Sequence, residues 1–218
     1  MKTDTELQRD VEDELRWQPA TRDAEIAVAA RDGVISLDGY VSSYAQKLSA
    51  ARAAEGVSGV RAVADELVVK LPNAATRTDT DIAHSAAKAL QWNIEVPDTR
   101  IKVRVEHGWI TLDGTVDWQF QRNAAEHTVR YLTGVKGLFN HIVVRQPTAS
   151  ANDVSGKIAD ALKRSAMVDA SRVMVDAQDG KVVLRGNLRS LAERQDAERA
   201  AWAAPGVSVV EDLITVGT

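Results

Sequence analysis

The sequence contains no cysteine, an absence that excludes disulfide bonds, thiolate metal ligands and cysteine nucleophiles together. It has no apolar run approaching the roughly 20 residues of a membrane-spanning helix. The amino-terminal stretch MKTDTELQRDVEDELRW shows neither an apolar segment of signal-peptide length nor a lipidation motif. We therefore expect a cytoplasmic protein without a transmembrane segment, or a periplasmic one if a leader has been removed.

Aromatic residues are scarce, and positive charge is not in excess. The chain has 27 basic and 31 acidic residues, for a net charge of -4. A non-specific nucleic-acid binder would carry a basic excess, so we expect no nucleic-acid partner. Aromatics make up 5% of the residues, and most of them lie between positions 92 and 139.

Glycine, in contrast, is placed with a regular spacing. Nine glycines form three sets with the same internal spacing, offset by 75 and then 72 residues, and they are Gly33, Gly39, Gly59, Gly108, Gly114, Gly134, Gly180, Gly186 and Gly206. A period of this size indicates three copies of one supersecondary unit, with glycines at its turns and helix caps. Near-equivalent modules in series are more typical of binding than of catalysis.

Each copy begins with a helix and continues with a strand hairpin. A capping-box pattern opens the copies at Thr3 with Glu6, Thr78 with Asp81, and Ser150 with Asp153. Apolar residues then recur every four positions, which predicts a helix with one buried face. Two strands of alternating pattern follow, joined by a two-residue turn at Asp32-Gly33, His107-Gly108 and Asp179-Gly180.

An alanine-rich helix follows in each copy and is expected to stop at the third glycine with a left-handed cap. A last strand follows, which a right-handed crossover would place parallel to the second. The fold class is therefore α+β, with three tandem αββαβ domains at residues 1–72, 76–147 and 150–218. In each, two helices pack on a three-stranded mixed sheet.

The stretches DGVISLDGYV, HGWITLDGTV and DGKVVLRGNL, each followed by a Gly-Val pair and a last strand such as TGVKGLFNHIVV, resemble the BON domain of bacterial osmotically inducible and nodulation proteins. The resemblance covers essentially the whole chain as three tandem domains. It implies a non-enzymatic protein that associates with phospholipid or the cell envelope and serves osmotic or general stress tolerance, and some relatives are linked to ion sensing.

We therefore predict a binding protein without catalysis or cofactor, whose partner is anionic phospholipid or an envelope-associated protein. The alternatives are a protein-protein assembly module and a cytoplasmic ion-sensing protein that uses backbone carbonyls.

The middle copy carries the candidate ligand-binding residues. Strand alternation turns Arg100, Lys102 and Arg104 outward on the same face as Trp109, which predicts a basic strip bordered by an indole. Such a strip suits a phosphate-bearing headgroup or an acidic partner. Alternatively, these are ordinary solvated charges, and Trp109 packs against a neighbouring copy.

Three other tryptophans need an interpretation. Trp118 begins the second helix where the other copies have serine, so we expect it to make an exposed contact. Trp17 and Trp92 end the first helices, two residues after the last buried leucine. We expect them to close the core, and a membrane-interface role is the alternative.

On the outer copies the corresponding sheet faces are apolar, at Val34, Val68, Met174 and Val183. We expect another copy or a second chain to cover them.

Residue types able to do chemistry do not converge. All four histidines lie in the middle copy, at His84, His107, His127 and His141, but none pairs with another at a metal-ligand spacing. No serine, histidine and acid set suggests a triad. Asp65, Asn140 and Asp212 recur before the last strands, where hydrogen bonding to a turn is the favoured interpretation. We therefore predict neither a metal site nor an enzyme.

Overall fold

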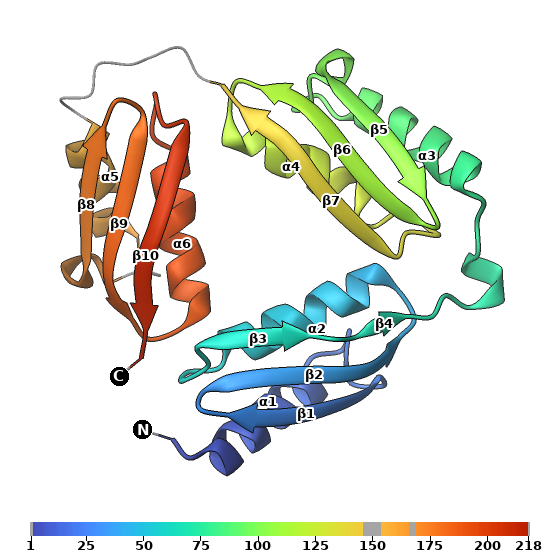
Figure 1. Ribbon diagram of the computed structural model, residues 1–218, viewed down its shortest axis with the longest axis horizontal. Helices are drawn as coiled ribbons and strands as arrows, with labels where there is room; N and C mark the ends of the chain where they lie inside the picture. Colours follow the sequence, from blue (N-terminus) through green and yellow to red (C-terminus); the bar gives the residue numbers. More distant parts are fainter. Residues whose placement is uncertain (1, 146–153, 166–168, 218) are drawn as a thin grey trace. The chain divides into compact units, whose positions relative to one another are not determined.

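The computed structural model describes residues 2–145, 154–165 and 169–217. Each repeat forms its own mixed sheet, and within each repeat two helices lie on one face of that sheet (Figure 1). The predicted α+β class is confirmed. In every repeat the second strand is central in the sheet, beside the first strand, and parallel to the last strand. In the second and third repeats it is antiparallel to the first strand.

The first repeat differs from the expected pattern in its last strand, which is divided in two. Its elements are α1 (Asp4–Trp17), β1 (Glu25–Arg31), β2 (Val34–Val41), α2 (Tyr44–Gly56), β3 (Ala62–Asp65) and β4 (Val68–Val69). Both β3 and β4 pair with β2 in parallel. Leu67, between them, is still buried in the core.

The second repeat follows a short 3-10 turn at Asn73–Ala75 and has a continuous last strand. Its elements are α3 (Asp79–Trp92), a 3-10 turn (Asp98–Arg100), β5 (Ile101–Glu106), β6 (Trp109–Val116), α4 (Gln119–Val129) and β7 (Gly137–Val144). The hairpin of β5 and β6 is antiparallel, and β7 pairs with β6 in parallel along its full length.

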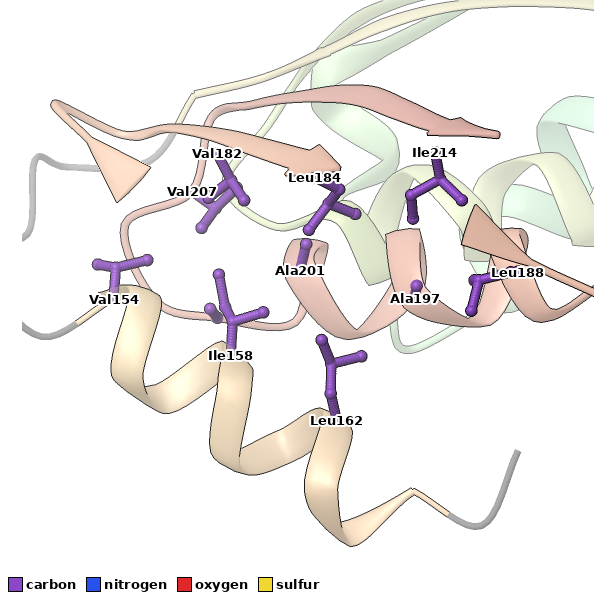
Figure 2. Close-up of a cluster of buried hydrophobic side chains, with 11 residues drawn as sticks. Val154, Ile158, Leu162, Val182, Leu184, Leu188, Ala197, Ala201, Val207 and Ile214 are labelled. Carbon is purple, nitrogen blue, oxygen red and sulfur yellow. The ribbon is translucent and has the colours of Figure 1, made fainter. Parts of the chain in front are cut away.

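The third repeat repeats this order. Its elements are α5 (Val154–Arg164), a 3-10 turn (Ala170–Arg172), β8 (Val173–Gln178), β9 (Lys181–Leu188), α6 (Leu191–Trp202) and β10 (Val209–Val216). Its core joins one face of α5, through Ile158 and Leu162, to Val182 and Leu184 of β9 (Figure 2). The small Ala201 of α6 lets that helix approach the same cluster. The core therefore uses the apolar stripes that the sequence predicts.

Local side-chain chemistry starts the first helices. Thr3 caps α1 and Thr78 caps α3, each in a complete capping box with Glu6 or Asp81, as predicted. The corresponding box at Ser150 and Asp153 lies outside the described residues. Asp65, Asn140 and Asp212 lie within β3, β7 and β10 rather than before the last strands as predicted, and each accepts a local hydrogen bond from the backbone N–H two residues later.

The predicted hairpin turns are also confirmed. Asp32, His107 and Asp179 have φ values of 51°, 55° and 49°, and each is followed by a glycine of positive φ. In the second repeat the Asp79 carboxylate holds this turn to α3, because it accepts hydrogen bonds from His107 N at 2.7 Å and Gly108 N at 2.8 Å.

The third glycine of each set does not cap the second helix, contrary to the sequence-based expectation. The helices end three to five residues earlier, at Gly56, Val129 and Trp202. Gly134, with φ of 97°, is the third residue of a turn closed by Val135 N donating to Leu132 O at 3.3 Å. That position of a type II turn needs positive φ, which explains the glycine without a helix cap.

Candidate functional site

The outer face of the second sheet, turned away from α3 and α4, carries three of the five predicted ligand-binding residues on its strands, and Arg100 lies in the 3-10 turn directly before β5. The strand register arranges this face in three rows across β5, β6 and β7, and they are Glu106, Trp109 and Gly137; Arg104, Thr111 and Phe139; and Lys102, Asp113 and His141. Lys102, Arg104 and Trp109 therefore share one surface, as predicted.

Trp109, Phe139 and His141 form a line of neighbouring rings, the aromatic row, which was not predicted from the sequence. Its ring centroid lies 5.1 Å from that of Phe139, which in turn lies 6.2 Å from that of His141. A Cβ added to Gly137 would overlap the indole of Trp109, so the ring needs a glycine on the neighbouring strand. The available signal was Gly137 itself, a glycine outside the repeated set, where the other repeats have Ala62 and Val209.

Acidic neighbours neutralise much of the positive charge of the predicted basic strip. Arg100 donates to both carboxylate oxygens of Asp117, at 2.9 and 3.0 Å. Arg104 lies 3.9 Å from Glu106. Lys102 makes no ion pair within the part of the chain that the structure describes, so it is the cation most available to a ligand on this face.

Trp118 is not part of this surface. It directly precedes α4, beyond the end of β6 opposite to Trp109, and β6 is eight residues long. At about 3.3 Å per residue, the strand alone separates its two end residues by roughly 23 Å. Arg100, through its bond to Asp117, belongs to the Trp118 end. The five predicted residues thus divide into two groups.

The prediction that Trp17 and Trp92 close the core is wrong. Their exposed fractions are 83% and 80%. Both stand two positions after a buried leucine, and two residues turn an α-helix by about 200°, which directs the side chain away from the buried face. Ile94, just beyond α3, is also fully exposed.

Trp92 and Ile94 lie beside the end of α4. Asn93, between them, donates its side-chain amide to Thr128 Oγ1 at 2.7 Å. The exposed Tyr131 follows one turn later, with the guanidinium of Arg130 4.9 Å from its ring centroid. We call Lys88, Trp92, Ile94, Arg130 and Tyr131 the α3 end.

Elements of their own repeats do not cover the apolar outer faces of the first and third sheets. Val68 is 51% exposed and Met174 66% exposed, Val34 is exposed as well, and Val183 is half-buried. Coverage by another repeat or by a second chain therefore stays a prediction. In the third repeat the same face also carries the ion pairs Arg185–Asp176 and Lys181–Glu211, which make it more polar than its apolar residues alone suggest.

The histidines of the second repeat have different structural roles. His107 forms the hairpin turn, His127 packs edge-on against Tyr131, and His141 lies 3.4 Å from Asp113. Within residues 2–145, 154–165 and 169–217, no three histidine or carboxylate side chains gather as metal ligands. None of the helices in those ranges is both long and apolar enough to cross a membrane.

Comparison with known proteins gives matches over the whole chain. The pattern of the BON domain family matches residues 3–70, 78–146 and 150–218. The osmotically-inducible protein Y of Escherichia coli strain K12 is 34% identical over 129 residues, which are 56% of this chain and 62% of that protein. The chain thus matches somewhat less than two thirds of this relative.

Similarity to solved structures is weaker. CdsD, a structural protein of the type III secretion system of Chlamydia trachomatis, aligns at 16% identity and a TM-score of 0.28, over 96% of this chain and 91% of that one. Its C-terminal domain aligns with the same identity and TM-score over all of both chains. A TM-score this low supports no structural argument.

Proposed function

Because the chain belongs to the BON domain family, with three of these domains in series, we propose that it is a non-enzymatic, osmotic-stress-related protein that binds anionic phospholipid surfaces through the α3 end of its second repeat. Family membership and the osmotically inducible relative support the stress role. The lipid contact depends on the surface of this chain.

The exposure of Trp92 and Ile94 carries the proposal. A tryptophan that is 80% exposed beside a fully exposed isoleucine is costly to keep in water, and tryptophan favours the boundary between lipid headgroups and acyl chains. Tyr131 adds a second amphipathic ring at the same end of the repeat.

Nearby cations suit an anionic headgroup. Lys88 lies one turn before Trp92 on α3, and the two residues line a common shallow depression. Arg130 stands over the ring of Tyr131. Each such cation adds about 1 kcal/mol of attraction near an anionic membrane. Glu95 follows Ile94 and opposes this attraction, so we expect weak binding that decreases with salt.

Flotation of the full chain with vesicles tests the proposal. We expect co-flotation with phosphatidylglycerol vesicles at low salt and little with phosphatidylcholine vesicles. W92A/I94A should lower the bound fraction by about tenfold, because it removes both apolar groups from the interface.

The matched control is W17A. Trp17 is equally exposed at the equivalent position of the first repeat, but Asp13 and Glu14 stand where the second repeat has Lys88 and Ala89. W17A should bind within twofold of the unaltered chain. Absence of binding at low salt, or equal losses for W17A and W92A/I94A, would contradict the proposal.

A further inference from the structure

A groove runs between α3 and the edge strand β5, on the inner side of the second sheet. Its volume is about 480 Å³, within the range of ligand pockets, and it is lined by Thr80, Ala83, His84, Ala87, Leu90, Asp98, Ile101 and Val103. Five of these eight lining residues are apolar. No proposed lipid-binding residue lines this groove.

Small side chains on α3 open the groove. Ala83 and Ala87 lie one turn apart on the helix, facing Ile101 and Val103. The first repeat has Gln8 and Glu12 at the equivalent positions, where Gln8 Nε2 donates to Glu12 Oε1 at 2.9 Å. The same helix face is therefore occupied by a hydrogen-bonded pair in one repeat and left open in the other.

The groove borders an open sheet edge. In the sheet order β5-β6-β7, β5 pairs with β6 alone. Glu106 and Trp109 flank the two-residue turn, so hydrogen-bonded pairs alternate from there and direct the backbone N–H and C=O of Val103 and Val105 away from β6. These groups form a template for one further strand.

Cations line the outer side of the same edge. Lys102 and Arg104 alternate with Val103 along β5 and are exposed. The equivalent residues are Ala27 and Ala29 in the first repeat, and Met174 and Asp176 in the third. A strand added to β5 would place alternate side chains in the groove and the others beside Lys102 and Arg104.

We propose that the second repeat binds an extended acidic peptide segment of a partner protein, which adds a strand to β5, inserts small apolar side chains into the α3–β5 groove and pairs its carboxylates with Lys102 and Arg104. Backbone hydrogen bonds supply affinity in this mode, and the alternate side chains supply specificity. Opposite charges that face each other on neighbouring strands add to both the affinity and the specificity.

Fluorescence anisotropy with the full chain tests the proposal. The probe is a blocked, labelled heptapeptide in which valine and glutamate alternate, and the reference probes are its scrambled isomer and a version with lysine in place of glutamate. We expect the alternating acidic peptide to bind at least about tenfold more tightly than either reference, a difference of about 1.4 kcal/mol.

Two variants address the two halves of the site. A83Q/A87E introduces the amide and carboxylate of the first repeat on the helix surface, and K102E/R104E reverses the edge charges. Each should weaken binding at least fivefold. K136E/R145E makes the same change of charge beside the opposite edge strand, β7, and should bind within twofold of the unaltered chain. Circular dichroism checks that all variants are folded.

Hydrogen exchange distinguishes strand addition from other modes of binding. The peptide should slow exchange of the Val103 and Val105 amides, which face the open edge, far more than that of the Lys102 and Arg104 amides, which already face β6. Equal affinity for the scrambled peptide, binding unaffected by A83Q/A87E, or unchanged exchange at Val103 and Val105 overturns the proposal. Because no vesicle is present, these results are independent of lipid binding.

Discussion

Asp79 connects two parts of the second repeat that are 28 residues apart, the start of α3 and the β5–β6 turn. Backbone N–H donors from Gly108 and His107 stabilise its carboxylate and lower its pKa from the ordinary value. Asp79 therefore stabilises the fold through the negative charge of its carboxylate. The third repeat has Ala151 at the equivalent position and lacks such a carboxylate.

We therefore predict that D79N weakens the attachment of this turn in a pH-dependent way. A lowered pKa means that the stabilisation is complete above the unfolded-state pKa near 4 and is lost as the pH falls through the lower folded-state value. Hydrogen exchange of the Gly108 amide should be faster in D79N than in the unaltered chain at neutral pH. Exchange rates referred to the intrinsic rate should converge once the pH falls below the lowered folded-state pKa of Asp79, and a difference that stays constant as the pH falls through that pKa would show that charge is not the cause.

At the scale of elements, the residue at the start of the second helix distinguishes the second repeat from the other two. Ser43 and Ser190 each accept a hydrogen bond from the backbone N–H three residues later, at 3.1 and 3.2 Å, at the start of α2 and α6. The side chain of Trp118 has no acceptor to offer α4 at this position. Its backbone N–H donates to Gln121 Oε1 at 3.1 Å, and its carbonyl oxygen accepts from Gln121 N at 3.1 Å. The second repeat thus lacks a side-chain cap that both of the others have.

W118S should stabilise the second repeat by about 0.5–2 kcal/mol, the usual contribution of an N-cap hydroxyl. Urea unfolding followed by circular dichroism measures the change. S190A provides the reciprocal test, with a loss of similar size expected in the third repeat. If W118S instead destabilises the protein, packing of the indole outweighs the missing cap.

The elements that could be predicted depend on short-range chemistry. Capping boxes, the aspartate-glycine turns and the four-residue apolar spacing all act within a few residues, so one sequence suffices to recognise them. The aromatic row was missed because its rings meet only in the parallel register of β6 with β7, which the crossover through α4 determines. The exposure of Trp92 was predictable from helix geometry, since two residues do not return to the same face.

At the scale of the whole molecule, the three repeats share a fold and differ in what they present. The first repeat exposes small apolar residues on its sheet and the third exposes ion pairs, while the second combines an aromatic row, an open groove and an apolar helix end. In all three, the first and third repeated glycines lie in turns, whereas the second lies within the central strand, where a Cβ would meet the neighbouring backbone. Functional differences therefore arise from residues at positions that the fold leaves free.

The parallel pairing of β6 with β7 has a kinetic consequence. Trp109 and Gly137, opposite each other in the register, are 28 positions apart in the chain, whereas the hairpin partners Glu106 and Trp109 are only three apart. Closing the longer loop costs more chain entropy before any contact compensates it. During synthesis, the hairpin can form early, but the repeat is complete only when its last strand has emerged.

Conservative truncations of two buried residues can reveal this order. I110V, in the hairpin, should mainly slow folding of the second repeat, whereas I142V, in β7, should mainly accelerate its unfolding, each at a cost of about 0.5–1.5 kcal/mol. Stopped-flow chevron analysis separates the two rates. A larger folding-rate effect for I142V would mean that β7 docks before the hairpin. In the expected order, the hairpin forms before the rate-limiting barrier of folding, and the last strand of the repeat docks after it.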